Sequence, residues 1–352
     1  MSKAAELASL ASASETALSN RNIVINGAMQ ISQRATSVTG IGASAGYFTL
    51  DRFDMFFSGT AGRLTMSQDS NAPEGFGNSL KLDCTTADTS IAAGEVAMLQ
   101  YQVEGQDLQQ LKKGTSNAEK VTVSFYVKGN ANATYTLELQ DNDNSRHIAQ
   151  TFNVTTSWNR VSLTFAGDTT GAFGDDNACS LRVQIYLQAG STYTSGTFTS
   201  NTWSAITNAN TVKSDQTMFF DSTARTLSIT GLQIEVGPVA TPFEHRSFGQ
   251  ELALCQRYYH EMQVKGINTA AGSTQTYMAC FQPFATTMRA APTTTSADVN
   301  DATANKVNIW GSGNVGFASL QADTNSIKYI QLSSGISTTN ILLGDMTFDA
   351  EL

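Results

Sequence analysis

The sequence predicts an all-β protein: an antiparallel β-sandwich of jelly-roll type with a short N-terminal helix, a helical connector and a small C-terminal β domain. Two observations support this. Short segments that alternate apolar and polar residues follow one another from residue 22 to residue 236. Clusters of Gly, Asn, Asp and Ser separate them, without the intervening helices that parallel strands require.

Residues 1–21 carry the strongest helix signal in the first half of the chain. Leu7, Ala11 and Leu18 fall near the a and d spacing of a helix that packs on a partner. An isolated helix of this length is only marginally stable in water. We therefore expect it to serve virion attachment or oligomerisation once its partner is present; a frayed tail is the alternative.

Residues 22–246 form the predicted sandwich, a run of about ten strands. In the segment 121–129, Val123 and Phe125 point to one side while Thr122 and Ser124 point to the other, which we expect to face water. A sheet buried on one side requires a second sheet, so a sandwich follows. The expected strands lie at residues 22–32, 47–57, 62–68, 79–83, 96–103, 121–129, 134–141, 147–154, 160–167, 181–188 and 226–236.

The end of the sandwich is marked by Pro238 and Pro242, because proline lacks the N–H that a strand ladder requires. A domain boundary is expected near residue 246. Residues 247–264 follow as a helical connector with Glu251 in its first turn. Residues 265–352 read as a smaller β-rich tip domain, which would gain burial from partner chains.

The composition excludes several classes of protein. Charged residues make up 14% of the chain, against roughly 25% in an average soluble domain. The net charge of −9 argues against a nucleic-acid partner. No run of 18 apolar residues and no signal peptide is present, so neither membrane insertion nor export is expected. The cysteines lack close pairing and are expected to be buried thiols: Cys84, Cys179, Cys255 and Cys280.

No catalytic motif is recognisable, and the three histidines have no partner at metal-ligand spacing. The acidic loops at residues 141–147 and 167–177 are the places where paired carboxylates could support glycoside hydrolysis. The same loops could hold Ca²⁺, with Asp175 and Asp176 as the preferred ligands. The alternative is ordinary turn chemistry, because Asp, Asn and Gly dominate tight connections. No catalytic residue and no other cofactor is predicted.

Aromatic residues in neutral polar surroundings suit a sugar ring, because amides and carboxylates beside them can bind its hydroxyls. Trp158, Tyr193 and Trp203 fit this description and are the predicted ligand-binding residues. The alternative for each is a loop aromatic that closes an end of the sandwich. The cluster of Phe53, Phe56 and Phe57 is instead expected to pack in the core or between sheets.

Residues 231–259, GLQIEVGPVATPFEHRSFGQELALCQRYY, closely resemble a segment found in many structural and tail-fibre proteins of tailed bacteriophages, especially marine ones. Residues 20–53, with NRNIVINGAMQISQRAT and YFTLDRF, are similar to the opening of the same proteins. The resemblance covers most of residues 20–259. It implies a carbohydrate-binding-module-like jelly roll displayed on a virion, often within a homotrimer.

These observations together predict a non-enzymatic structural component of a phage appendage such as a tail fibre. Its expected partners are two further copies of the chain, other virion proteins and a host surface glycan, and its expected location is the virion after assembly in the host cytoplasm. A head fibre or decoration protein with a purely architectural role is the first alternative. A glycan depolymerase is the second.

Overall fold

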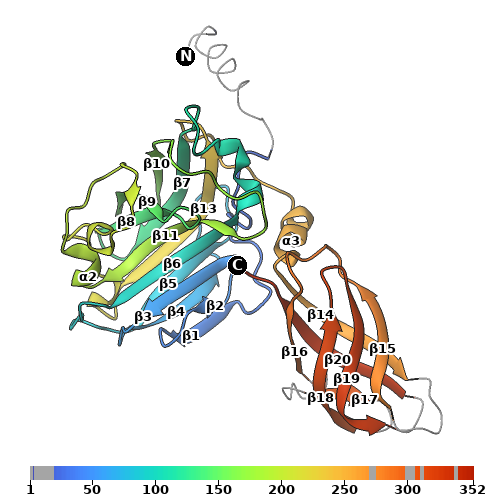
Figure 1. Ribbon diagram of the computed structural model, residues 1–352. Helices are drawn as coiled ribbons and strands as arrows, with labels where there is room; N and C mark the ends of the chain where they lie inside the picture. Colours follow the sequence, from blue (N-terminus) through green and yellow to red (C-terminus); the bar gives the residue numbers. More distant parts are fainter. Residues whose placement is uncertain (1–2, 4–19, 269–274, 298–305, 310–312, 337–339) are drawn as a thin grey trace. The chain divides into compact units, whose positions relative to one another are not determined.

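The computed structural model describes residue 3 and residues 20–268, 275–297, 306–309, 313–336 and 340–352, in two compact units (Figure 1). Unit 1 comprises the residues up to Ser247 together with Leu352, and unit 2 spans Phe248–Glu351. The division follows Ser247, next to the boundary that the two prolines predict. In the described parts of the chain, no helix is long and apolar enough to cross a membrane.

Unit 1 is a sandwich of two antiparallel sheets, as the sequence predicts. Sheet A has the strand order β1 (Ser37–Ile41), β4 (Arg63–Asp69), β5 (Ser79–Thr86), β13 (Thr226–Val236), β7 (Val121–Gly129) and β10 (Asn159–Phe165). Sheet B has the order β12 (Ser204–Ala205), β9 (Arg146–Val154), β8 (Ala133–Asp141), β11 (Cys179–Ala189), β6 (Val96–Glu104), β3 (Phe53–Ser58) and β2 (Gly46–Tyr47).

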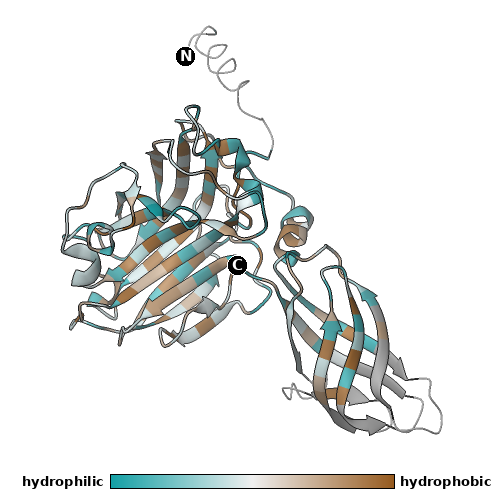
Figure 2. Cartoon of the chain, in the orientation of Figure 1, coloured by the Kyte–Doolittle hydropathy of each residue, from teal (hydrophilic) through white to brown (hydrophobic). Residues whose placement is uncertain are grey.

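The inner faces of the two sheets meet in one hydrophobic core. Val123 and Phe125 of β7 are fully buried there, as the alternation in that segment predicts. The Phe125 ring meets Phe152 of sheet B edge-on, with 5.1 Å between ring centroids. Alternating hydropathy is visible along the strands of both sheets (Figure 2). Burying one such side chain contributes about 1.5–3 kcal/mol to folding.

The connections carry short helical turns. One α-helical turn, α2 (Ser191–Thr194), follows β11. The 3₁₀ turns are η1 (Gly105–Asp107), η2 (Gln109–Leu111), η3 (Asn208–Asn210) and η4 (Phe219–Asp221). All four cysteines are free thiols; Cys84, Cys255 and Cys280 are buried as predicted, whereas Cys179 is half-buried.

The predicted strand at residues 22–32 is wrong. The backbone there turns, because Asn26 and Met29 adopt left-handed φ angles of 60° and 57°. The Asn26 side chain replaces ladder hydrogen bonds: its Nδ2 donates to the carbonyls of Ile31 at 2.8 Å and Asp51 at 3.0 Å. Val24 is nonetheless fully buried, so the apolar residues of this segment serve the core from a turn.

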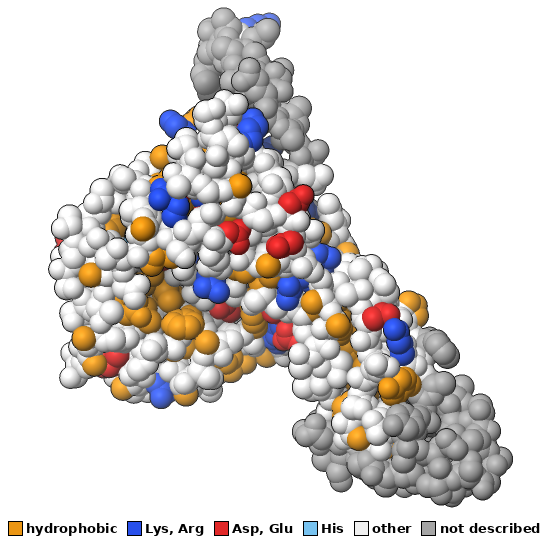
Figure 3. All heavy atoms as spheres, viewed as in Figure 1, with side chains coloured by type: hydrophobic (Ala, Val, Ile, Leu, Met, Phe, Trp, Pro, Cys, Tyr) orange, Lys and Arg blue, Asp and Glu red, His pale blue; other side chains and the backbone are white. Residues whose placement is uncertain are grey.

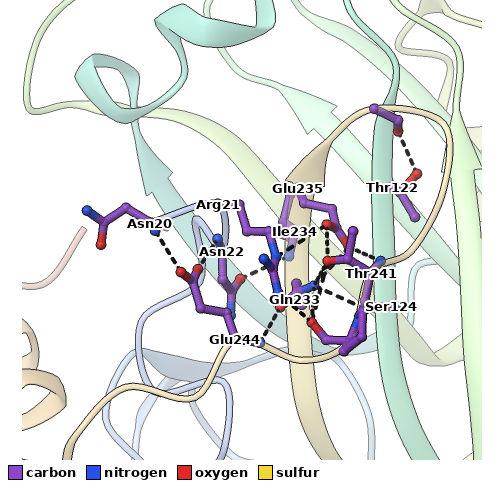
Figure 4. Close-up of polar contacts among 12 residues, drawn as sticks. Asn20, Arg21, Asn22, Thr122, Ser124, Gln233, Ile234, Glu235, Thr241 and Glu244 are labelled. Carbon is purple, nitrogen blue, oxygen red and sulfur yellow. Dashed lines mark hydrogen bonds and ion pairs between the residues drawn. The ribbon is translucent and has the colours of Figure 1, made fainter. Parts of the chain in front are cut away.

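Residues 237–246, which we call the strap, lie against the outer face of sheet A (Figure 4). Thr241 of the strap donates its backbone N–H to Glu235 Oε1 at 2.9 Å and its hydroxyl to Glu235 Oε2 at 2.6 Å. The backbone N–H of Glu244 donates to Gln233 Oε1 at 2.8 Å. The Glu244 carboxylate accepts the backbone N–H of Asn20 at 2.6 Å, so the strap also holds the first described residues of the sandwich.

The strap changes the environment of a face that we expected to be wet. Thr122 and Ser124 point away from the core, yet they are 0% and 1% exposed. Thr122 donates its hydroxyl to the carbonyl of Gly237 at 2.7 Å. The prediction that these two side chains face water is therefore wrong, because a later segment of the chain covers them.

Unit 2 begins with helix α3 (Phe248–Gln256) and continues as a sheet. The predicted helical connector to residue 264 is too long, since strand β14 already starts at Tyr259 and pairs along its length with the last strand. The strand order is β14 (Tyr259–Asn268), β15 (Gln275–Pro283), β19 (Ser326–Ile336), β18 (Gly313–Ala322), β17 (Lys306–Ile309), β20 (Asn340–Asp349) and β16 (Thr293–Ala297). An additional β14–β20 pairing joins the two sides of this sheet.

Candidate ligand-binding cleft

The middle strands of sheet B carry polar side chains on the face that points away from the core. On β6, Leu99 and Tyr101 belong to the core, so Gln100 and Gln102 face outward. The same alternation on the neighbouring strands completes a cleft of about 440 Å³. Its floor is formed by Asp54 and Phe56 of β3, Met98, Gln100 and Gln102 of β6, Arg182, Gln184 and Tyr186 of β11, and Glu138 and Gln140 of β8.

Strand register arranges this floor in rows that cross the strands. One row is polar and pairs Asp54 with Gln100, Gln100 with Gln184, and Gln184 with Glu138. Since neighbouring strands lie about 4.8 Å apart, the row is roughly 14 Å long between its outermost Cα atoms. A sugar chain of several units could lie along it.

The adjacent row is largely apolar. Phe56 pairs with Met98, and Met98 pairs with Tyr186. Phe56 is 36% exposed, which is unusual for a phenylalanine in the middle of a sheet. Seen from the side of sheet B, the molecule shows hydrophobic side chains gathered within a mostly neutral polar surface (Figure 3). The cleft therefore offers hydrogen-bonding groups beside apolar surface.

Glu138 is the centre of a buried network. Its Oε2 accepts the hydroxyl of Tyr186 at 2.8 Å, and its Oε1 lies 2.7 Å from Nδ1 of His147. The Glu138 and Tyr186 side chains are almost fully buried. Burial, followed by the charge of Glu138, holds the pKa of Tyr186 well above its usual value of 10. The phenol therefore stays neutral and fixes the orientation of the carboxylate.

The amides of the cleft floor are held to different extents. Gln184 donates its Nε2 to Oε1 of Gln140 at 2.7 Å. Arg182 donates its Nε to Oε1 of Gln102 at 3.4 Å. Within the described residues, by contrast, no group hydrogen-bonds the amide of Gln100. That amide retains its donors and acceptor for a ligand.

One wall of the cleft comes from the segment after β11. It contributes Tyr193 of α2 together with Ile206, Asn208 and Thr211. The backbone carbonyl of Tyr193 accepts the N–H of Val212 at 3.0 Å, which closes this segment on itself. The Tyr193 ring lies 6.5 Å from that of Tyr186 and is half-buried. Tyr193 is thus held at the edge of the floor with part of its ring open.

The cleft holds no activated nucleophile among its described residues. Cys179 lines it, but burial raises the pKa of this thiol in spite of the neighbouring Arg182. The arrangement can bind hydroxyls through amides and carboxylates, and it can accept the apolar face of a ring.

Of the three aromatic residues that the sequence singles out, the structure places only Tyr193 in the cleft. Trp203 packs against the core and donates its Nε1 to the carbonyl of Ala166 at 2.7 Å. That is the position of an aromatic that closes an end of the sandwich. Trp158 follows β9 and donates its Nε1 to Asn71 Oδ1 at 3.1 Å. Asn71 lies in the connection between two strands of sheet A, and neither tryptophan lines the cleft.

Asp175 and Asp176, the predicted calcium ligands, are exposed in the loop before β11. Asp176 Oδ1 accepts the backbone N–H of Ala178 at 2.9 Å, a contact typical of a turn. Among the described residues, no group of three or more His, Cys, Asp and Glu side chains is placed to hold a metal ion. Calcium binding at this pair stays a prediction.

Two further sequence predictions have different outcomes. Phe53 and Phe57 are buried in the core as predicted, but Phe56 is not, because it has the outward parity of Asp54 on β3. The predicted attachment residues Leu7, Ala11 and Leu18 lie outside the described residues. Their role stays a prediction.

Sequence reasoning missed most of the cleft. The missed residues are polar side chains inside strands, and a signal for them exists: amides and carboxylates repeat with outward parity in LQYQV, LELQ and RVQIYLQ. That parity identifies the outer face of each strand. It does not reveal that these three strands are neighbours, which only the strand order provides.

Comparison with known proteins gives a limited result. No protein-family model and no curated protein sequence matches the chain. Among solved structures, a family 11 carbohydrate-binding module from Clostridium thermocellum, in complex with a β-1,3-1,4-mixed-linked tetrasaccharide, is similar. Its TM-score is 0.29 at 10% identity, over 59% of this chain and 98% of that chain.

Two other solved structures are similar at the same level. A family 29 carbohydrate-binding module complexed with mannohexaose has a TM-score of 0.27 at 11% identity, over 60% of this chain and 99% of that chain. An exo-β-agarase has a TM-score of 0.31 at 7% identity, over 63% of this chain and 25% of that chain. Likeness at these values transfers no function, so the cleft has to be interpreted from its own chemistry.

Proposed function

We propose that the protein is a non-enzymatic glycan-binding protein and that the cleft on sheet B is its binding site. The observation that carries the proposal is the pair of rows on the cleft floor. One row ends in Asp54 and Glu138 with two glutamines between them, and the other contains Phe56 and Met98. An oligosaccharide has the matching chemistry, because each sugar presents hydroxyls at its edge and C–H groups on its face.

Neutral amides favour hydroxyl groups over ions. A glutamine amide both donates and accepts, as a hydroxyl does. The free amide of Gln100 lies at the middle of the polar row, and the half-open ring of Tyr193 stands at the wall. We therefore place one sugar ring against Tyr193, with its hydroxyls directed toward Gln184 and Gln100.

The geometry favours binding over hydrolysis. Glycosidases hold two carboxyl groups about 5–9.5 Å apart. In the cleft, Asp54 and Glu138 stand on strands separated by two others, roughly 14 Å apart between Cα atoms. Glu138 is also engaged by Tyr186 and His147. A depolymerase would need a different pair.

The setting that we propose for this activity is a phage appendage such as a tail fibre, assembled as a homotrimer with other virion proteins. It is supported by the sequence resemblance of residues 20–53 and 231–259 to tailed-phage proteins. A head fibre or decoration protein is the alternative setting. Imaging of intact particles with a labelled chain distinguishes tail from head; a chain absent from the particle contradicts both.

The binding proposal is tested with the purified full chain on a glycan array and on host envelopes, followed by calorimetry on the best glycan. Tyr193→Ala should weaken binding roughly 2- to 10-fold, because an aromatic contact contributes about 0.5–1.5 kcal/mol. Trp158→Ala is the matched control, since it removes an aromatic that does not line the cleft.

Three results would count against the proposal or a part of it. Absence of binding to every glycan and to host envelopes would favour a purely architectural role. Equal weakening by Trp158→Ala and Tyr193→Ala would move the site away from the cleft. Release of reducing ends from host polysaccharide would contradict the non-enzymatic assignment alone.

A further inference from the structure

The two acidic loops that the sequence singles out do meet, but they meet around a lysine. Lys113 follows η2, and its side chain is 4% exposed. It reaches Asp141 at the end of β8 and Asp168 after β10, whose side chains are 0% and 4% exposed. A lysine this deeply buried requires compensation for the water it has lost.

Four oxygens surround the ammonium. Nζ of Lys113 lies 2.5 Å from Asp141 Oδ2 and 3.1 Å from Asp168 Oδ2. It donates to the backbone carbonyls of Thr170 and Gly171, both at 2.8 Å. An ammonium has three hydrogens, so four oxygens at these distances exceed its donors. The oxygens are arranged around a cation, not around individual N–H bonds.

Groups other than the lysine also hold the two carboxylates. Asn144 donates its backbone N–H to Asp141 Oδ1 at 3.0 Å. Arg146 donates its Nε to Asp168 Oδ2 at 2.7 Å, and the backbone N–H of Thr170 donates to Asp168 Oδ1 at 3.1 Å. Burial raises the pKa of Asp168, but the hydrogen bonds from Arg146, Thr170 and Lys113 lower it by more. The pKa is therefore below its usual value, and this carboxyl is ionised at neutral pH.

The backbone at Gly171 favours glycine. Its φ is +71°, and an added Cβ would lie 2.2 Å from Asn144 Oδ1. The asparagine that orients Asp141 also donates its Nδ2 to the carbonyl of Ala172 at 2.9 Å, next to the glycine whose carbonyl faces Lys113. Two loops far apart in sequence share one preformed oxygen site.

Aromatic rings close the other side of the site. The ring centroids of Phe173 and Trp203 lie 5.2 Å and 5.4 Å from Lys113 Nζ. Both distances fall within the range in which a ring face attracts a cation. The position is electronegative on every side that these contacts define.

We propose that Lys113 Nζ is the resident cation of a calcium-type oxygen site, so that this end of the sandwich needs no metal ion. Carboxylate and carbonyl oxygens are the donors that Ca²⁺ accepts in flexible geometry, whereas Mg²⁺ demands a near-ideal octahedron. On this proposal, removing the lysine side chain should leave these oxygens in place and open room for an ion with its waters. This proposal is independent of glycan binding in the cleft.

The decisive variant is Lys113→Ala in the full chain. Without calcium its Tm should fall by about 10 °C, because loss of one partner exposes buried carboxylates to each other's charge. Millimolar CaCl₂ should restore at least half of that loss in Lys113→Ala and leave wild type unchanged. Terbium, a luminescent calcium substitute, should bind Lys113→Ala and be excited through Trp203; Lys113→Ala/Trp203→Phe should lack that emission.

Matched variants test whether the lost charge or the vacated space explains the behaviour of Lys113→Ala. Lys113→Met removes the charge but keeps the stem in the site, so it should be destabilised without calcium rescue. Lys112→Ala removes a neighbouring lysine whose ion pair with Glu119 is exposed and should behave as wild type. Lys113→Ser, whose side chain is also short enough to leave room for an ion, replaces Lys113→Ala if the latter is insoluble with and without calcium.

The proposal is overturned if calcium fails to stabilise both Lys113→Ala and Lys113→Ser, or if it rescues Lys113→Met equally. It is also overturned if a chelator lowers the Tm of wild type and Asp141→Asn abolishes that effect, since the lysine would then share its site with a metal.

Discussion

The outer faces of sheets A and B both carry glutamine and glutamate side chains that are almost fully buried. On sheet A, Gln233 and Glu235 are 0% and 2% exposed because the strap lies on them and satisfies their hydrogen bonds. On sheet B, Gln100 and Glu138 are 6% and 2% exposed, but they line a cleft of about 440 Å³. Gln233 is structural on one face, whereas the amide of Gln100 is available to a ligand on the other.

The difference comes from what the chain does after each central strand. β13 leads directly into the strap, whose Thr241 and Glu244 return to the strand they follow. β11 leads into α2, and Tyr193 there forms a wall beside the floor instead of a cover over it. An outer polar face becomes a site only where the chain leaves it open.

The largest effect that separates the two faces is expected from Glu235→Ala. It removes the acceptor of two hydrogen bonds from Thr241 and leaves buried donors unsatisfied, so the free energy of unfolding should fall by about 3 kcal/mol. Urea denaturation measures it. Glu235→Gln, which keeps one acceptor, should lose less, and glycan affinity should not change in either variant.

A loss below about 1 kcal/mol in Glu235→Ala would show that the strap does not depend on this carboxylate. A parallel loss of glycan affinity would show that the two faces are coupled.

A matched pair of glutamines tests the comparison directly. Gln233→Ala should lower the free energy of unfolding by about 2 kcal/mol, because it leaves the backbone N–H of Glu244 without its acceptor. Gln100→Ala should change it by no more than about 0.5 kcal/mol, since no described group bonds that amide.

In binding, the order should reverse. Gln100→Ala should weaken glycan affinity roughly 5- to 10-fold, the value of one hydrogen bond, and Gln233→Ala should leave it unchanged. Calorimetry on both variants decides. If Gln100→Ala is the more destabilised of the two, Gln100 stabilises the fold, which contradicts the difference that we draw between the outer faces of the two sheets.

The smallest effect concerns alkaline pH. The folded pKa of Tyr186 lies above that of the unfolded chain, so the folded state binds more protons once the unfolded tyrosine begins to ionise. The stabilising contribution is complete below about pH 10 and is lost as pH rises toward the folded pKa. Wild type should lose stability above pH 10 more steeply than Tyr186→Phe, measured by urea midpoints between pH 8 and 11.

At pH 8, Tyr186→Phe should itself lose about 1 kcal/mol, because Glu138 loses the hydroxyl donor. Identical slopes above pH 10 in the two proteins would mean that Tyr186 ionises in the folded state as it does in the unfolded chain.

The sequence predicts local properties well where one strand decides them. The alternation in β7 correctly places Val123 and Phe125 in the core. The same rule, applied to β3, would have placed Phe56 outside, but its neighbours Phe53 and Phe57 suggested a cluster. The strand predicted at residues 22–32 was wrong for a different reason. The apolar residues there are buried as their pattern suggests, but the left-handed φ angles of Asn26 and Met29 bend the backbone into a turn.

The candidate site was predicted less completely than the fold. Tyr193 was identified because it stands in a polar loop, where an aromatic residue is conspicuous. Gln100, Gln184 and Glu138 sit inside strands, where polar residues of outward parity are ordinary. Their grouping depends on β6, β11 and β8 being adjacent, and these strands are separated by up to about 80 residues of chain.

The sequence by itself determined the all-β class, the end of the sandwich near residue 246 and the inward or outward parity along most strands, because these depend on contacts within a few residues. Only the tertiary structure decided which outer face is open, which loop aromatic joins a cleft and which cation the acidic loops surround. The strap reaches Thr122 of β7, Tyr193 borders a floor that includes β6 and β8, and Lys113 joins Asp141 to Asp168; these contacts link residues distant in sequence. Contacts of that kind leave no periodic pattern in a short stretch of sequence, so the sequence alone does not predict them.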